Sequence, residues 1–244
     1  MLDQDVRTQV LIGEANLARL HQTRVCIVGL GGVGSSAAEA LARAGICLFT
    51  LIDFDRINPT NLNRQIIALH STIGQTKTDV LKERILDINP DANVICHNEF
   101  CAIENRPNLI RDQDYILDAI DSLGPKVGLI EYAVQNSFRI ITVMGAGNRL
   151  DPSQIRISDI SETVNCPLAK RVRKFLRRRG IKSGIPCVYS MEPAHIPEEL
   201  EDEPDEMVIH RGRKRKTVGS ISYMPVIMGM YTASWIIRDL ISVK

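Results

Sequence analysis

Glycines near the start of the chain follow the pattern G-x-G-x-x-G, at Gly29, Gly31 and Gly34. The run just before them, residues 25–28, is apolar and β-branched, which is typical of a buried parallel strand. Glycine permits a tight turn after such a strand and lets a phosphate approach the backbone without a Cβ in the way. In this context the pattern predicts a turn that binds the phosphates of a nucleotide.

A helix and a second strand must follow if this turn is to bind a nucleotide. Residues 35–44 are rich in alanine and predict the helix, whose first N–H groups would point at an anion. Residues 48–52 predict the strand, and Asp53 stands at its carboxyl end, where a carboxylate accepts hydrogen bonds from a ribose. Together these features indicate a nucleotide site, and the alternative is a tight turn that binds nothing.

Charged residues further along favour a triphosphate over a dinucleotide. Arg64 and Lys77 follow the Asp53 strand, and two cations beside one nucleotide suit a triphosphate. Asp118 and Asp121 end a later strand, at the edge where a carboxylate is placed to hold Mg²⁺. The alternative is that the cations are solvated and the carboxylates cap helices.

Length and composition bound the class of protein. The 244 residues are 44% hydrophobic, enough for one large α/β domain. The six cysteines form no C-x-x-C pair, which argues against a zinc site and favours reduced thiols in a cytoplasmic protein. The N-terminus is polar, unlike a signal peptide, and the longest apolar run, residues 223–237, is shorter than a membrane span. We therefore expect a cytoplasmic protein with no membrane partner.

Alternating predicted strands and helices indicate a Rossmann-like, doubly wound, mostly parallel sheet of the α/β class. Further strands are expected at 94–96, 115–117, 139–144, 154–157 and 187–190, and helices at 74–88, 126–136 and 224–241. The last two strands and the terminal helix form a smaller C-terminal extension with mixed strands.

We expect one domain over residues 1–244, in three parts. Residues 1–22 form a helical lead-in, residues 23–145 a nucleotide-binding core, and residues 146–244 a substrate-binding half. The apolar contacts expected of the lead-in are Val10, Leu11, Leu17 and Leu20.

Charge is segregated in the second half, although the net charge is only +1. A basic stretch at 170–182 and a second basic cluster at 211–216 flank an acidic run at 198–206, which we expect to be a mobile loop. Basic clusters are typical of contacts to a nucleic-acid backbone, and the alternative is two solvated faces. The expected RNA-binding residues are Lys170, Arg171, Arg173, Lys174, Arg177, Arg178, Arg179, Lys182, Arg213, Lys214 and Arg215.

Five motifs resemble the E1-like superfamily, the ubiquitin-activating-type adenylating enzymes. They are GLGGVGS at 29–35, LIDFD at 51–55, NLNRQ at 61–65, GQTK at 74–77 and DAID at 118–121. The resemblance implies binding of ATP and Mg²⁺, attack of a substrate carboxylate on the α-phosphate, and release of pyrophosphate from an acyl adenylate.

The resemblance also implies roles for individual residues. Lys77 would neutralise charge on the triphosphate, Asp121 would ligate Mg²⁺, and Asp53 would hold the ribose. Arg7 resembles an arginine that the family supplies across a homodimer interface. The implied catalytic residues are Arg7, Arg64, Lys77 and Asp121. The implied nucleotide contacts are Gly31, Gly32, Asp53, Asp55, Asn61, Arg64, Gln65, Lys77, Asp121 and Ser122.

The second half resembles one subgroup, the tRNA threonylcarbamoyladenosine dehydratases. The stretches that carry this are DPSQIRISDI at 151–160, CVYSME at 187–192 and GSISYMP at 219–225. The subgroup implies that the activated carboxylate belongs to the threonyl group of a modified adenosine in the tRNA anticodon loop. The neighbouring carbamoyl group then attacks and closes a ring, with net loss of water.

Two other functions are weighed against this one. An activator of a ubiquitin-like sulfur carrier would use the same chemistry, but such proteins usually carry zinc-binding cysteine pairs. A non-catalytic E1-like scaffold would not need Arg64, Lys77 and Asp121. The sequence leaves open whether an accessory sulfur-transfer or carrier protein binds, and no residue stands out as the base for ring closure.

Overall fold

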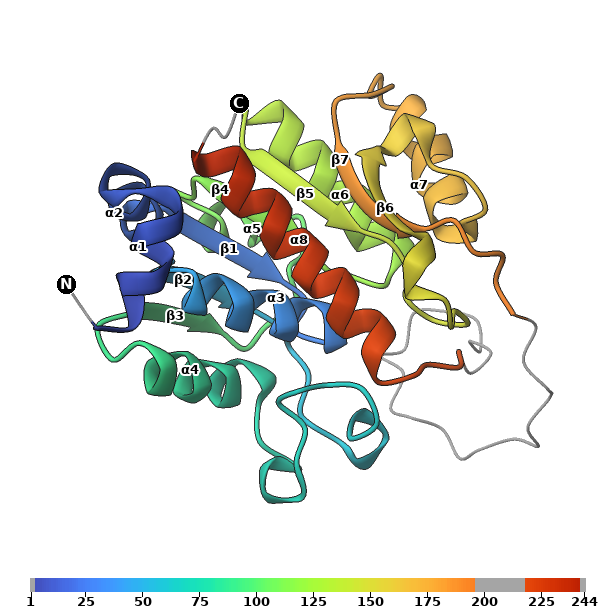
Figure 1. The fold of residues 1–244 in the computed structure, drawn as a ribbon. Helices are drawn as coiled ribbons and strands as arrows, with labels where there is room; N and C mark the ends of the chain where they lie inside the picture. The colour runs from blue at the N-terminus through green and yellow to red at the C-terminus, as the bar shows by residue number, and fades with distance from the viewer. Residues whose placement is uncertain (1–2, 196–217, 242–244) are drawn as a thin grey trace.

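A computed structural model describes residues 3–195 and 218–241. Seven strands form one sheet in the order β3-β2-β1-β4-β5-β7-β6 (Figure 1). β6 pairs antiparallel with β7, and the other neighbouring strands are parallel. The strands are β1 (Arg24–Val28), β2 (Leu48–Ile52), β3 (Asn93–His97), β4 (Tyr115–Asp118), β5 (Arg139–Val143), β6 (Ile155–Asp159) and β7 (Pro186–Ser190). The predicted mostly parallel α/β sheet is confirmed.

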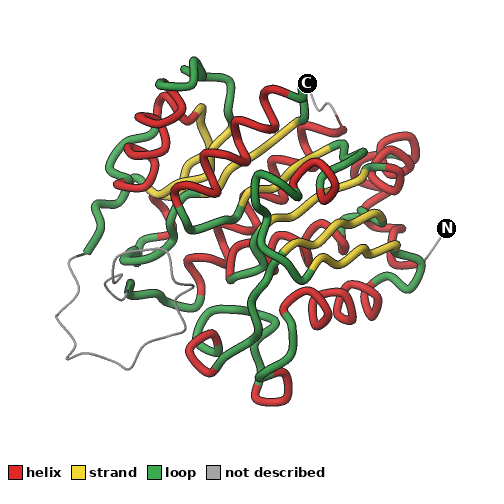
Figure 2. Tube along the Cα trace, turned by 180° about the vertical axis from the view of Figure 1, so that it is seen from behind, coloured by secondary structure: helices red, strands yellow, loops and turns green. Residues whose placement is uncertain are grey.

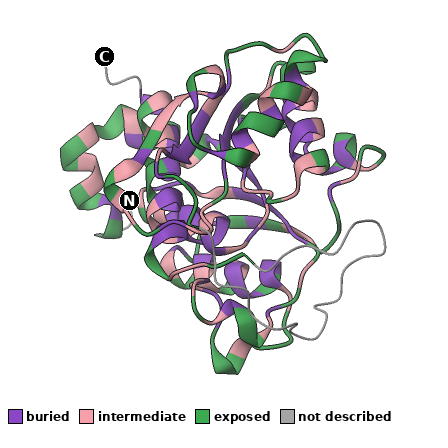
Figure 3. Ribbon diagram, turned by 90° about the vertical axis from the view of Figure 1, so that its right-hand side faces the viewer, coloured by how far each residue is buried: buried purple, intermediate pink, exposed green. Residues whose placement is uncertain are grey.

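Helices cover both faces of this sheet (Figures 1 and 2). They are α1 (Val6–Ile12), α2 (Glu14–Gln22), α3 (Gly32–Arg43), α4 (Lys77–Ile88), α5 (Arg106–Leu109), α6 (Leu123–Gln135), α7 (Pro167–Arg177) and α8 (Tyr223–Ile241). Side chains alternate along a strand, so Val25 and Ile27 of β1 join the core under α3, α4 and α8, while Cys26 and Val28 join the core under α6 and α7. The central strands are accordingly buried (Figure 3).

α8 lies directly against α3. A Cβ added to Gly229 of α8 would meet Val33 O at 2.6 Å and Ala37 N at 3.0 Å. Only glycine permits such a close approach of two helix backbones. The terminal helix is therefore seated on the helix that follows the glycine turn.

The lead-in differs from the expectation. Gly13 has φ +84° and breaks it into α1 and α2. Leu17 and Leu20 of α2 are buried as predicted, but the prediction for Val10 and Leu11 is wrong, since both are 84% exposed. The turn at Gly13 directs α2 onto the core and leaves α1 outside it.

Some predictions lie outside the described residues. These are the acidic run at 198–206 and the second basic cluster, with Arg213, Lys214 and Arg215. Within the described ranges, no helix combines the length and hydropathy needed to cross a membrane.

Candidate nucleotide-binding site

The glycine turn links β1 to α3 and is packed against backbone on its inner side. Gly29 has φ +92°, and a Cβ there would meet Ala119 O at 2.8 Å. A Cβ at Gly34 would lie only 1.9 Å from Gly29 O. At Gly31, by contrast, the nearest neighbour is Gln65 Nε2 at 3.8 Å. The turn therefore has no space for a side chain at Gly29 or Gly34, but it is open at Gly31, as an approaching phosphate requires.

The N-terminus of α3 opens at this turn. Its N-cap residue is Gly31, so no side chain caps the first N–H groups of the helix. Uncapped N–H groups and the helix dipole attract an anion. The predicted positions of Gly31 and Gly32 next to the phosphates fit this geometry.

Asp53 follows β2 and accepts a hydrogen bond from the backbone of the glycine turn. Its Oδ2 accepts the N–H of Leu30 at 2.6 Å, and its Oδ1 accepts the N–H of Asp55 at 2.8 Å. Burial raises the pKa of the Asp53 carboxyl, although the charge of Lys77 and the two backbone hydrogen bonds oppose this. Each carboxylate oxygen has a second lone pair, which leaves capacity for a ribose hydroxyl.

Lys77 is the first residue of α4 and is only 5% exposed. Its Nζ lies 2.6 Å from Asp55 Oδ2, and its charge also acts on Asp53. A solvated surface cation would not be buried in this way, so that alternative is wrong for Lys77. The cation is held beside Asp53, next to the glycine turn.

The loop after β2 holds three further predicted residues, of which Arg64 and Gln65 lie against the glycine turn. Asn61 is buried and caps its own loop by accepting the N–H of Asn58 at 3.3 Å. Arg64 donates from Nη1 to Thr60 O at 2.7 Å, while its own carbonyl faces Gly32. Gln65 is buried, and its Oε1 has no hydrogen-bond partner among the described residues. An orphaned buried acceptor beside Gly31 suits a ligand that donates a hydrogen bond.

The two predicted carboxylates after β4 have different environments. Asp118 is fully buried, and Lys126 of α6 donates from Nζ to its Oδ2 at 2.7 Å. Thr142 of β5 donates to the same oxygen at 2.6 Å. Asp121 is exposed and accepts the Ser122 hydroxyl at 3.0 Å. Asp118 is therefore occupied by a structural ion pair, and Asp121 is the carboxylate accessible to a metal ion.

Lys126 was missed by sequence reasoning. Its only signal was a lysine inside an apolar helix, and such residues usually turn to solvent.

No group of three or more His, Cys, Asp or Glu within residues 3–195 and 218–241 is placed to hold a metal ion by itself. Mg²⁺ usually binds through one or two carboxylates together with phosphate oxygens and water. The exposed carboxylate of Asp121, close to the glycine turn, fits that mode.

The predicted RNA-binding residues of the first basic stretch lie along and after α7. The start of α7 is at the glycine-turn edge of the sheet, because Asn165 Nδ2 donates to Met191 O, just past β7 (2.9 Å). The far end of α7 leads to Gly184, whose N–H donates to Asp159 at the opposite edge of the sheet, away from the glycine turn. The members near the glycine-turn edge are Lys170 and Arg171, whereas Lys174 and Arg177 lie in the last turn of α7 and Arg178, Arg179 and Lys182 follow it.

Three of these cations are engaged within the chain, and one of them, Arg178, lies over the ring of Phe175 at 5.5 Å from its centroid. Arg173 donates from Nη1 to Thr163 O at 2.6 Å, and Arg179 Nε lies 2.9 Å from Glu131 Oε2. The structure shows no ion pair for Lys170, Arg171, Lys174 or Arg177 with any residue it describes.

Arg7 lies on α1, at the edge of the sheet opposite the glycine turn (Figure 1). α2, which follows it, contacts the far end of α3: a Cβ at Gly45 would meet Leu17 at 2.9 Å. A strand of five residues spans about 17 Å, so Arg7 is out of reach of the glycine turn in its own chain.

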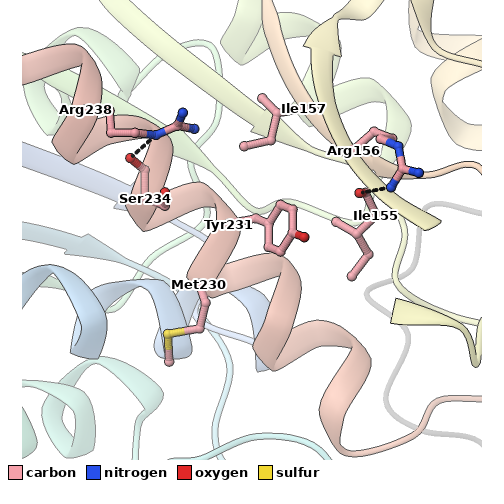
Figure 4. Close-up of a pocket in the computed structure, with 7 residues that line it drawn as sticks. All are labelled: Ile155, Arg156, Ile157, Met230, Tyr231, Ser234 and Arg238. Carbon is pink, nitrogen blue, oxygen red and sulfur yellow. Dashed lines mark hydrogen bonds between the residues drawn. The ribbon is translucent and has the colours of Figure 1, made fainter. Parts of the chain in front are cut away.

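A separate groove lies between β6 and α8 (Figure 4). It has a volume of about 450 Å³, and Tyr231 of α8 points toward Ile155 of β6 across it. The glycine turn does not line this groove.

Comparison with known proteins points to one family. The model of the ThiF family matches residues 3–244. A curated protein of Bacillus subtilis, named tRNA threonylcarbamoyladenosine dehydratase, is 38% identical over 245 residues, covering 99% of this chain and 96% of its own length.

Two solved structures of Escherichia coli tRNA N6-threonylcarbamoyladenosine dehydratase, TcdA, are also similar. The complex with AMP has a TM-score of 0.87 at 34% identity and covers 97% of this chain and 93% of its own. The complex with ATP has a TM-score of 0.86 at 34% identity, with coverage of 98% and 94%.

Proposed function

This chain belongs to the ThiF family, and we propose that it is an ATP-dependent tRNA threonylcarbamoyladenosine dehydratase. It adenylates the threonyl carboxylate of N6-threonylcarbamoyladenosine and promotes ring closure, releasing pyrophosphate and AMP. The observation that carries this is the uncapped N-terminus of α3 beside buried Asp53 and Lys77. The similar E. coli enzyme has been solved with both ATP and AMP.

The roles follow from the geometry of the turn. N–H groups at Gly31 and Gly32 bind phosphate oxygens, and Lys77 shifts from Asp55 toward the triphosphate as charge develops on it. Asp53 holds the ribose. Gln65 supplies its unpartnered Oε1 to the nucleotide. Mg²⁺, when bound, screens the phosphate charge, and Asp121 is the residue that would ligate it.

The decisive experiment is mass spectrometry of tRNA nucleosides after incubation of the protein with tRNA and ATP. A nucleoside lighter by one water, formed only with ATP, is the expected product. Calorimetric titration with ATP and Mg²⁺ in parallel with NAD tests the cofactor, and tighter binding of NAD would contradict adenylation.

tRNA is the proposed macromolecular partner, and its contact surface is the start of α7. Lys170 and Arg171 are exposed there, on the side of the glycine-turn edge. A row of unpaired cations attracts a phosphate backbone without reading its sequence.

We also propose a homodimer in which Arg7 completes the site of the partner subunit. Arg7 is exposed on α1 beside Val6, Val10 and Leu11, which form an apolar face that no residue of 3–195 or 218–241 covers. Since Arg7 cannot reach its own glycine turn, any role at a nucleotide requires a second copy. Mixing Arg7→Ala with Asp121→Ala chains should restore part of the activity through hybrid sites. Verified heterodimers without restored activity would exclude the role in trans.

A further inference from the structure

A histidine and a glutamate lie past the end of β7, at the same edge of the sheet as the glycine turn. His195 Nε2 is 2.7 Å from Glu192 Oε1. The Glu192 side chain is 7% exposed and that of His195 is 57% exposed. The pair therefore presents an imidazole to solvent and keeps its carboxylate below the surface.

Glu192 is fixed by backbone groups. Its Oε2 accepts the N–H of Leu150 at 3.0 Å and that of Asp151 at 2.9 Å. Desolvation raises the pKa of the Glu192 carboxyl, but the hydrogen bonds from Asp151, Leu150 and His195 outweigh it and lower that pKa overall. An ionised carboxylate accepts a hydrogen bond from Nε2 of the ring, which leaves Nδ1 with a free lone pair.

The backbone of His195 is fixed as well. Its N–H donates to Asn148 O at 2.9 Å. Buried Arg149 donates to the same carbonyl at 3.1 Å and to Asn165 O at 3.2 Å. The loop that supports the imidazole is thus tied both to the segment after β5 and to the start of α7.

A short series of contacts leads from this pair to the glycine turn. Tyr223, the first residue of α8, donates its hydroxyl to Leu150 O at 2.8 Å, and Leu150 in turn donates to Glu192. Two residues further along α8, Pro225 lies against Gly32, where an added Cβ would meet it at 2.9 Å. The glycine turn and the Glu192–His195 pair therefore adjoin the same first turn of α8.

We propose that His195, oriented by Glu192, is the general base of ring closure, a role for which the sequence alone offered no candidate. The inference rests on the proposed dehydratase function. In the adenylated substrate, the carbamoyl group attacks the activated carbonyl carbon and forms the ring bond. The bond from that carbon to AMP breaks, and AMP leaves with the electron pair. The carbamoyl group loses one N–H proton, which His195 accepts at Nδ1.

The carboxylate has a defined part in this step. Glu192 fixes the tautomer and orientation of the ring and stabilises the imidazolium that forms, as the acidic member of a catalytic triad does. It is a positioning residue, since it does not meet the substrate.

The test compares activation with ring closure in His195→Ala, using the full chain and tRNA that carries N6-threonylcarbamoyladenosine. Activation is measured as tRNA-dependent exchange of labelled pyrophosphate into ATP, and ring closure as the cyclised nucleoside. We expect ring closure to slow by about 10²-fold or more, while exchange continues and hydroxylamine traps the acyl adenylate. Added imidazole should restore part of the rate, because it replaces the missing proton acceptor.

Two further variants sharpen the result. His70, exposed on the short turn η3 (His70–Thr72), is the matched control, and His70→Ala should close the ring at the wild-type rate. Glu192→Gln should slow ring closure without rescue by imidazole, because its own imidazole is present but misoriented.

Wild-type ring closure in His195→Ala would overturn the assignment, and so would a raised KM for tRNA with unchanged kcat. Failure of the proposed function gives a different result: the wild-type protein would exchange no pyrophosphate with this tRNA and form no cyclised nucleoside.

Discussion

Around the glycine turn, most contacts are made by backbone and buried charge, whereas along α7 the charges face solvent. Gly34 leaves no room for a Cβ, and Asp118 and Lys126 are fully buried as an ion pair. Lys170 and Arg171, in contrast, are exposed. A nucleotide has one shape and needs a rigid site, while an RNA backbone is a repeating charge that exposed cations can follow. Substitutions around the glycine turn should therefore lower the stability of the fold, whereas substitutions on α7 should weaken tRNA binding.

The largest effect is expected from Lys126→Met. It leaves the Asp118 carboxylate buried without its cation, which should lower the free energy of unfolding by about 3 to 5 kcal/mol. Urea unfolding of the variant measures this change.

The matched control is the double variant Lys126→Met with Asp118→Asn. It removes both charges and keeps an acceptor for the Ile120 N–H, so it should recover part of the loss. A double variant as unstable as the single one would show that the unpaired charge is not the cause.

Gly34→Ala comes next. The added methyl group would collide with Gly29 O, and we expect a loss of about 1 to 3 kcal/mol or more together with weaker ATP binding. A Cβ added at Gly124 of α6 would meet no atom within 4 Å, so Gly124→Ala should be neutral or stabilising by up to about 1 kcal/mol. Equal stability of the two variants, measured by thermal unfolding, would contradict the close packing of the turn.

On the RNA side, charge reversal should weaken tRNA binding and leave ATP binding intact. Changing Lys170 and Arg171 to Glu should lower the slope of log K against log salt by about 1.4 to 1.8, at about 0.7 to 0.9 per lost contact. The same change at Arg177, the last residue of α7, and at Lys182, which follows it, is the matched control and should have a smaller effect. Equal slopes for the two variants would remove the start of α7 as the contact surface.

The smallest effect concerns acid stability. The lowered pKa of Glu192 means that its stabilising contribution is complete above the ordinary carboxyl pKa of 4.5 and is lost as the pH falls through the lowered value. The Tm of the wild type should therefore fall more steeply below pH 4.5 than that of Glu192→Gln. Glu162→Gln, at an exposed position, should follow the wild type, and a parallel fall in all three proteins would rule out this contribution.

The glycine turn was predictable because its chemistry requires particular residue types at short spacing. Gly29 to Gly34 and Asp53 belong to one strand–helix–strand unit, and β2 has the predicted bounds. Lys77 and Asp121 were predicted from their charge and from their places after two strands, and both lie at the same edge.

The other features of the site could not be predicted, because they depend on contacts between residues that are far apart in the sequence. The Lys126–Asp118–Thr142 cluster exists only because β4 and β5 are neighbours in register. Nothing local shows that β6 runs antiparallel and ends at the far edge, or that residues 160–165 then return to the glycine-turn edge, where α7 begins near Lys170. Likewise, the exposure of Val10 depends on the turn at Gly13.

The contact between Pro225 and Gly32 joins the start of α8 to the glycine turn. Asn63 adds to it by donating from Nδ2 to Ser220 O at 3.1 Å, so the start of α8 is fastened to the nucleotide loop. A ligand that displaces the start of α8 must also displace Gly32, because close-packed backbone has little room to absorb the shift. By reciprocity, any factor by which bound RNA changes the affinity for ATP is the factor by which ATP changes the affinity for RNA.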